Sequence, residues 1–134
     1  MHITIVHNIE AFLKALGGDF AFVGRQVPIK IAGNTHYIDL VLQHIGIPCK
    51  VLVDLKIGKL DAKDIGQMNK YVNYYRKHRQ YIHEKNTIGL IICKEAHHEE
   101  VMYALGDLEE KIFIAEYKLK LPSEEKIKKI MHKF

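Results

Sequence analysis

The chain has 134 residues, of which 48% are hydrophobic and 27% are charged. This length suits one domain, and the composition is that of a folded globular protein, which excludes large multidomain machines and mostly disordered chains. No apolar run approaches the roughly 18 residues of a membrane span, and the N-terminus has neither a basic leader nor a small-residue cleavage site. We therefore expect a cytoplasmic protein with no membrane partner. Two cysteines, Cys49 and Cys93, are few for a disulfide-dependent secreted domain, and we expect buried thiols.

Basic residues give the chain a net charge of +4, and they are clustered. One cluster is Arg76–Arg79, and six further lysines lie between residues 118 and 133. Such clusters are compatible with a polyanionic partner, because lysine and arginine displace condensed counterions from phosphates. Solvated basic helix faces produce the same pattern, so the charge alone does not identify a partner.

The first half of the chain predicts one helix followed by strands. Apolar residues recur at helical intervals from 8 to 16, with Asn8 as a cap and Gly17–Gly18 as a stop. We expect a turn at Gly33–Asn34 and the end of a strand at Gly58. The β-rich stretches are residues 20–25, 27–31, 37–43 and 50–56.

The second half of the chain alternates helices and strands. Helical spacing over 61–82 predicts a helix of about six turns. The short apolar run 88–93 is typical of a strand buried on both faces of a mixed or parallel sheet. A short helix at 99–108, a strand at 111–117 and a basic C-terminal helix at about 123–133 complete the series. The order is about αβββαβαβα, which indicates an α/β fold with one domain over 1–134.

Charged residues within apolar strands mark the candidate site. Asp54 and Lys56 lie two apart on one strand and therefore point to one face. Asp39 lies within an earlier apolar strand, and an ionised group near a core is costly unless it is paired or binds a metal. If the two strands pair, Asp39 and Asp54 converge with the peptide oxygen of Leu55 in a pocket of hard oxygens suited to Mg²⁺ or Mn²⁺.

An acid-x-Lys triplet on a strand is by itself usually an ion pair at a sheet edge. Here an acid on one strand is followed fifteen positions later by Asp54-x-Lys56 and then by a long helix. This combination is much rarer than the triplet and favours a functional site.

Several ordered segments extend this pattern over most of the chain, from about Ile9 to Pro122. They resemble the C-terminal nuclease domain of the YhcG-type bacterial proteins. That family belongs to the PD-(D/E)XK superfamily, and the resemblance implies its restriction endonuclease-like fold, a central mixed β-sheet flanked by helices. The matching segments are Phe20–Gln26, Tyr37–Leu40, Asp54–Lys59, Gly66–Asn69 with Tyr71, Ile88–Lys94 and Ala115–Tyr117.

The resemblance assigns catalytic roles to three strand residues. Asp39 corresponds to the first acid of the motif, Asp54 to the variable acid and Lys56 to the lysine. Ile38 replaces the proline of the motif name, and Asp54 stands where the YhcG-type domain usually has glutamate. Glu10 matches a glutamate that many members supply from the first helix as a further metal ligand, although a solvated acid in a first helical turn is an equal alternative.

Other residues are assigned to support and to DNA contact. Gln67 and Tyr71 share a helix face and resemble the Gln-x-x-x-Tyr element that some exonuclease-like members place beside the catalytic lysine. We expect Gln67 to support Lys56, with Tyr71 and Arg25 near the DNA. A cap on a neighbouring carbonyl group is the alternative role of Arg25, and the phosphate role is slightly favoured. Residues 97–100, His-His-Glu-Glu, fit a solvated helix start better than a metal site. Phosphate contacts are expected from Arg76, Lys77 and Arg79.

The resemblance implies a Mg²⁺- or Mn²⁺-dependent deoxyribonuclease that hydrolyses phosphodiester bonds to a 5′-phosphate and a 3′-hydroxyl. The alternative is a non-catalytic domain on the same fold that binds DNA or a protein. A small-molecule enzyme ranks last, because the sequence has no Gly-rich phosphate loop or nucleophile motif. Related folds often dimerise, so a homodimer is one expected state. The family usually carries a further N-terminal module, so the chain acts alone or is a fragment.

Overall fold

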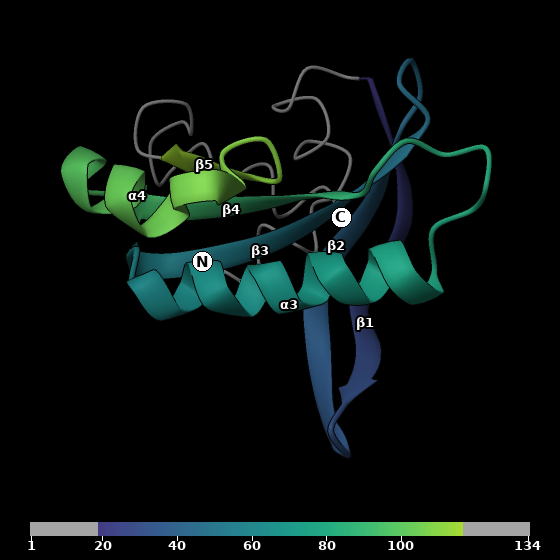
Figure 1. Ribbon diagram of the computed structural model, residues 1–134, viewed down its shortest axis with the longest axis horizontal. Helices are drawn as coiled ribbons and strands as arrows, with labels where there is room; N and C mark the ends of the chain where they lie inside the picture. Colours follow the sequence, from purple (N-terminus) through teal and green to yellow (C-terminus); the bar gives the residue numbers. More distant parts are fainter. Residues whose placement is uncertain (1–18, 117–134) are drawn as a thin grey trace, which may run out of the picture.

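The computed structural model describes residues 19–116. Over this range a five-stranded sheet has the order β1-β2-β3-β4-β5. The order of strands and helices agrees with the sequence prediction, whereas the predicted helices at 8–16 and 123–133 lie outside the described residues (Figure 1). The elements are β1 Phe20–Ile31, β2 Asn34–His44, β3 Cys49–Lys59, α3 Ala62–His78, β4 Ile88–Glu95, α4 His98–Leu105, the 3₁₀ turn η1 Gly106–Leu108 and β5 Ile112–Glu116.

The sheet is mixed and changes direction at β3. β1, β2 and β3 pair antiparallel, and β3, β4 and β5 pair parallel. Parallel neighbours need a crossover, which α3 supplies between β3 and β4. The apolar run of β4 is explained by its interior position, because Ile91 and Cys93 pack on one face and Ile92 on the other. Cys49 and Cys93 are both buried thiols, as predicted.

The β1–β2 hairpin differs from the sequence prediction in two ways. The stretches 20–25 and 27–31 are one strand, which bends where Gln26 takes a positive φ of 48° and where the register shifts after Phe22. The turn is Ala32–Gly33, with φ values of 51° and 82°, because Asn34 already pairs with Ile31. Two positive φ values are what a two-residue hairpin turn of type I′ requires. The tip of this hairpin projects beyond α3 (Figure 1).

Helix α3 is shorter than the predicted 61–82. It begins with a capping box. The Asp61 side chain accepts a hydrogen bond from the N–H of Asp64, and the Asp64 side chain accepts one from the N–H of Asp61. It ends at His78, where the N–H of Arg79 bonds to the carbonyl of Tyr75. Beyond the helix the side chains of Tyr81 and Ile82 are exposed and add nothing to the buried core. β3 likewise runs through Gly58 to Lys59 rather than ending at the glycine.

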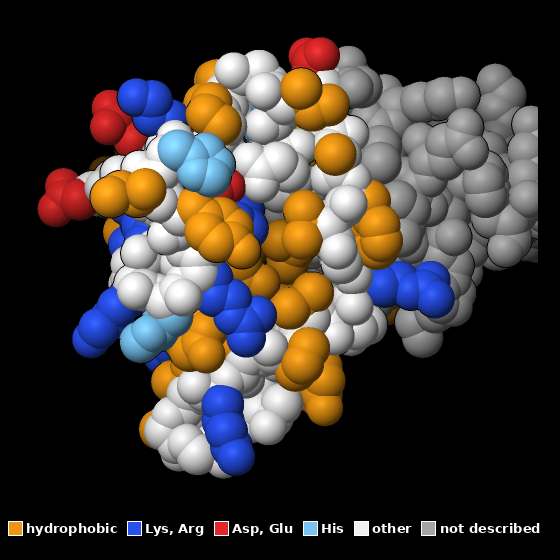
Figure 2. Space-filling view, turned by 90° about the vertical axis from the view of Figure 1, so that its right-hand side faces the viewer, with side chains coloured by type: hydrophobic (Ala, Val, Ile, Leu, Met, Phe, Trp, Pro, Cys, Tyr) orange, Lys and Arg blue, Asp and Glu red, His pale blue; other side chains and the backbone are white. Residues whose placement is uncertain are grey.

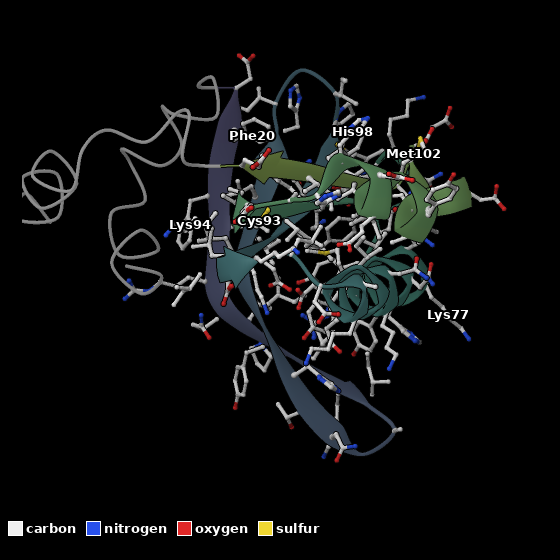
Figure 3. The ribbon with its side chains drawn as sticks, turned by 90° about the vertical axis from the view of Figure 1, so that its left-hand side faces the viewer. Phe20, Lys77, Cys93, Lys94, His98 and Met102 are labelled. Carbon is white, nitrogen blue, oxygen red and sulfur yellow. The ribbon has the colours of Figure 1, made fainter. Side chains whose placement is uncertain are left out.

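The hydrophobic core beneath α3 fixes where the polar end of the helix lies. Met68 and Val72 of α3 pack on Val41, Leu52 and Ile91 of the sheet, and α4 joins the same cluster. Figure 3 shows α3 nearly end-on beside the sheet. The opposite face of the sheet carries a second apolar cluster. Because the first turns of α3 follow directly on β3, they lie against the polar end of β2 and β3.

Candidate active site

Asp39 and Asp54 face each other across β2 and β3. The last paired residues of this ladder are Leu40 and Val53, and one step further the register places Asp39 opposite Asp54. At this position carboxylate oxygens, rather than backbone carbonyl oxygens, accept the backbone N–H groups. The Asp39 N–H donates to Oδ1 of Asp54 at 3.3 Å, and the Leu55 N–H donates to Oδ2 of Asp39 at 2.8 Å. The Nε2 of Gln26 donates to Oδ1 of Asp39 at 3.0 Å.

This arrangement brings two negative charges together at a half-buried position. Like charges directly opposite each other in a sheet are destabilising. A divalent cation between or beside them would offset that repulsion, and carboxylate oxygen is the ligand type that Mg²⁺ and Mn²⁺ prefer. The residues therefore fit such an ion in their chemistry.

Lys56 lies on the same face of β3 as Asp54 and turns toward the first turn of α3. Its Nζ is 3.4 Å from Oδ2 of Asp64, with 36% of the Lys56 side chain and 21% of the Asp64 side chain exposed. The same Asp64 oxygen accepts the N–H of Asp61 at 2.8 Å. The capping box of α3 thus also provides the counter-ion of the lysine.

Gln67 and Tyr71 occupy the next turns of α3 on the same side. The Gln67 Nε2 lies 2.7 Å from the Tyr71 hydroxyl and 3.1 Å from Nδ1 of His36 on β2. Burial raises the pKa of Tyr71, the hydrogen bond from Gln67 lowers it, and the charges of Asp54 and Asp39 raise it further; the net change is upward. The phenol therefore stays protonated at neutral pH and lies close enough to sense both carboxylates.

A pocket of about 170 Å³ joins these groups. It brings together every residue that the sequence assigned to catalysis or to the metal, apart from Glu10, which lies outside the described residues. Among residues 19–116, no group of three or more His, Cys, Asp or Glu side chains is arranged to hold a metal. The lining residues are Tyr37, Asp39, Asp54, Leu55, Lys56, Asp64, Gln67 and Ile91.

The residues assigned to DNA contact lie apart from this pocket, with the exception of Tyr71, which is buried beside it. Arg25 is exposed on β1, opposite Leu40. Lys77 is exposed near the end of α3, ten residues and about 15 Å beyond Gln67 along the axis.

The two arginines near the end of α3 both have protein partners. Nε of Arg76 donates to the carbonyl of Thr87 at 2.9 Å, and burial lowers the pKa of its guanidinium. Arg79 lies over the rings of Tyr74 and Tyr75 and reaches the carbonyl of Pro28 at 3.4 Å. Figure 2 shows that the lower half of this face, over the end of α3 and the hairpin, carries Lys and Arg side chains and no Asp or Glu.

The sequence prediction assigned no site role to the lining residues Tyr37, Asp64 and Ile91, nor to Gln26 and His36, which hydrogen-bond to lining residues. Asp64 had a usable signal, because Asp64, Gln67 and Tyr71 recur at the spacing of one helix face. Gln26 and His36 had none, since they reach the site through the bend and register of the β1–β2 hairpin.

A mixed sheet with an acid on one strand, acid-x-Lys on the next and a helix packed over both defines a nuclease domain of the PD-(D/E)XK class. The sequence model of the family described as "YhcG PDDEXK nuclease domain" matches residues 1–132. The chain belongs to this family.

An individual protein supports the same family. Over 124 residues the chain is 40% identical to "Putative nuclease YhcG" of Escherichia coli (strain K12). The aligned region covers 92% of this chain and 33% of the relative. The chain therefore spans about a third of the length of that protein.

Two solved structures show the same fold at low sequence identity. A repair endonuclease from Pyrococcus abyssi matches with a TM-score of 0.60 and 15% identity, covering 81% of this chain and 45% of that one. EndoMS in a complex with double-stranded DNA matches with a TM-score of 0.55 and 12% identity, covering 81% of this chain and 43% of that one.

Among the described residues, no helix is long and apolar enough to cross a membrane.

Proposed function

We propose that this chain is a Mg²⁺- or Mn²⁺-dependent deoxyribonuclease that hydrolyses phosphodiester bonds. The observation that carries the proposal is the single pocket into which Asp39, Asp54, Lys56 and Gln67 all converge. Two opposed carboxylates beside a lysine are the groups needed to bind a cation and to counter the charge of a phosphate.

The metal would be held by Asp39, Asp54 and the carbonyl of Leu55, with Glu10 as a further ligand. Protein sites for Mg²⁺ commonly use one or two carboxylates and leave the remaining positions to water and substrate phosphate, so two acids are sufficient. When bound, the ion supplies a water of lowered pKa and neutralises charge on the scissile phosphate.

The protein residues orient the reactants. The Lys56 ammonium would donate hydrogen bonds to the attacking water or to a non-bridging phosphate oxygen, and its contact with Asp64 would direct it. Gln67 would hold the same water from α3. The water oxygen would bond to phosphorus and release a proton to solvent, while the bond from phosphorus to the 3′-oxygen breaks and the 3′-oxygen takes up a proton from solvent. The products would be a 5′-phosphate and a 3′-hydroxyl.

DNA would lie along α3 and the β1–β2 hairpin. Three exposed lysines recur every seven residues on α3, namely Lys63, Lys70 and Lys77, and lie within about 40° of one another around the helix and about 21 Å from first to last. This lysine row borders the side of α3 that carries Gln67. With Arg25, Arg76 and Arg79 it would contact backbone phosphates, which position DNA without reading its sequence.

The test is cleavage of branched, single-stranded and duplex DNA with Mg²⁺ by the chain and by three variants. Asp54→Ala and Lys56→Ala should each lower kcat by about a hundredfold or more. The matched control is Asp107→Asn, an exposed acid on η1 that does not line the pocket, and it should cleave normally. Unchanged cleavage in both pocket variants would overturn the proposal.

A non-catalytic DNA- or protein-binding domain is the competing function, and the Asp54 substitution for the usual glutamate favours it. Melting curves with and without Mg²⁺ separate the two. An intact metal pocket raises the melting temperature by mass action in the original chain and not in Asp54→Ala. DNA binding without cleavage and without that shift would support the competing function.

A further inference from the structure

The side-chain amide nitrogen of Gln67 has two polar neighbours, and neither of them is a carboxylate of the pocket. Its nitrogen lies 3.1 Å from Nδ1 of His36 and 2.7 Å from the Tyr71 hydroxyl. An amide nitrogen can only donate, so this contact is a hydrogen bond in the tautomer whose Nδ1 accepts and whose ring proton lies on Nε2.

His36 reaches Gln67 from the hairpin and not from the helix. It lies on β2, three residues before Asp39, and its partner on β1 is Ile29. Its ring centroid is 6.0 Å from that of Tyr71. The half-buried imidazole and the buried phenol thus hold the amide nitrogen from two sides. Gln67 also lines the pocket, and its carbonyl oxygen is the polar atom of this side chain that these two contacts do not use.

We propose that His36 is a positioning residue, which holds Gln67 with its carbonyl oxygen toward the pocket so that this oxygen accepts a hydrogen bond from the attacking water or from the Lys56 ammonium. The inference rests on the proposed nuclease function. The opposite amide orientation would present two donors to a water that must itself donate. It would occur whenever Nδ1 of His36 carries a proton, because Nδ1 would then require the Gln67 oxygen.

A ring with its proton on Nδ1 would therefore turn the amide, and we expect this orientation to lower the rate. From α3 the phenol of Tyr71 also lies beside His36, and the partner of His36 on β1 is the uncharged Ile29. Asp39 is the nearest acid along β2.

The first test needs neither metal nor DNA. Long-range ¹H–¹⁵N spectra of the metal-free chain distinguish the two imidazole tautomers, and the His36 signal is assigned by its loss in His36→Asn. We expect the Nε2–H tautomer at neutral pH. A ring protonated on Nδ1 at that pH would overturn the proposal.

The second test compares cleavage kinetics of two variants that differ in one acceptor. Asn carries an oxygen near the place of Nδ1, so His36→Asn should keep kcat. His36→Leu removes the acceptor and should lower kcat about ten- to a hundredfold, with KM for DNA unchanged. His98→Leu, an exposed histidine on α4, is the matched control and should behave as the original chain (Figure 3).

The outcomes separate this inference from the nuclease proposal. If Asp54→Ala is inactive while His36→Leu has the original kcat, the positioning role is wrong and the nuclease proposal stands. Equal losses of kcat in His36→Leu and His36→Asn, with both variants folded, would also overturn the role, because the acceptor would then not matter. If Asp54→Ala and Lys56→Ala both cleave normally, the nuclease proposal itself fails.

Discussion

Asp39 and Asp54 stand opposite each other one residue beyond the last paired position of β2 and β3, and the N–H of Asp39 bonds to the carboxylate of Asp54 at 3.3 Å. Asp54→Asn keeps an oxygen for that hydrogen bond and removes one of the two facing charges. Without metal the variant should be more stable than the original chain by about 0.5 kcal/mol, because a repulsion between opposed like charges is relieved.

Urea unfolding in EDTA and in Mg²⁺ measures this effect. The original chain should gain stability with Mg²⁺ by mass action, and Asp54→Asn should gain little. A variant that is less stable than the original chain in EDTA would contradict the predicted repulsion.

The ion pair between Lys56 and Asp64 can be separated from the helix cap. Asp64→Asn keeps an acceptor for the N–H of Asp61 but loses the charge, and it should cost about 0.5 kcal/mol because the pair is partly solvated. Asp64→Ala also removes the acceptor for the N–H of Asp61 and should cost about 1 kcal/mol more. Urea unfolding of both variants checks the order; equal losses would show that the cap contributes nothing.

The lysine row on α3 should make DNA binding sensitive to salt. Binding is measured in a Lys56→Ala background with Mg²⁺, so that the DNA remains intact. Lys70→Ala or Lys77→Ala should each reduce the slope of log affinity against log salt by about 0.9, the value for one phosphate contact on duplex DNA. Lys94→Ala is the control, because Figure 3 shows Lys94 on the other side of the molecule from Lys77. Identical slopes for all of these variants would refute the proposed path.

A buried ion pair joins the start of β3 to the loop after α3, and it should make stability depend on acid. Nζ of Lys50 is 2.7 Å from Oε1 of Glu84, with 11% and 2% of the side chains exposed. Burial raises the pKa of Glu84, but hydrogen bonds from Lys50 and from the Tyr81 N–H outweigh it, and the net pKa lies below the ordinary 4.5. A depressed folded-state pKa stabilises the fold above pH 4.5, and this contribution is lost as the pH falls through the folded value.

Glu84→Gln tests that contribution. The variant leaves the Lys50 charge buried without its carboxylate and should be about 3 kcal/mol less stable at pH 7. Its unfolding free energy should also fall less steeply than that of the original chain below pH 4.5. Chemical denaturation from pH 7 to 3 provides the comparison, and parallel curves would exclude Glu84 as the source of the acid sensitivity.

The close approach of α3 to β4 depends on Gly89. A Cβ at this position would lie 2.5 Å from Cγ and 2.7 Å from Sδ of Met68, and 3.0 Å from Cγ2 of Val72. Both side chains are fully buried, so Gly89→Ala should destabilise the fold by about 1–3 kcal/mol. Gly58→Ala meets no atom within 4 Å and is the matched control. Equal stability of the two variants, measured by urea unfolding, would contradict the packing argument.

The sequence predicted those parts of the site that depend on simple periodicity. The two-residue alternation of a strand places Asp54 and Lys56 on one face, and antiparallel pairing brings Asp39 to the same end. The apolar run of β4 likewise identified an interior strand. These features follow from local geometry that any strand shares.

The sequence did not predict features set by backbone bends and tertiary contacts. A positive φ at Gln26 has no residue preference behind it, so one bent strand looked like two. The end of α3 at His78 is decided by the loop that follows, where the side chain of Gln80 bonds to the N–H of Thr87. His36 reaches Gln67 only because the hairpin curves alongside the helix, which no spacing rule encodes.

β1, β2 and β3 form an antiparallel meander, in which each strand pairs with the next one along the chain. This arrangement affects how the domain folds. Asp39 and Asp54 are fifteen residues apart and joined by one tight connection, so closing the loop between them costs little chain entropy. Among residues 19–116, the pocket residues from Tyr37 to Gln67 come from one continuous segment, and only Ile91 is supplied from beyond the crossover. The part of the domain made of β1, β2, β3 and the start of α3 therefore has low contact order. We expect it to form before β4 and β5 pair with β3.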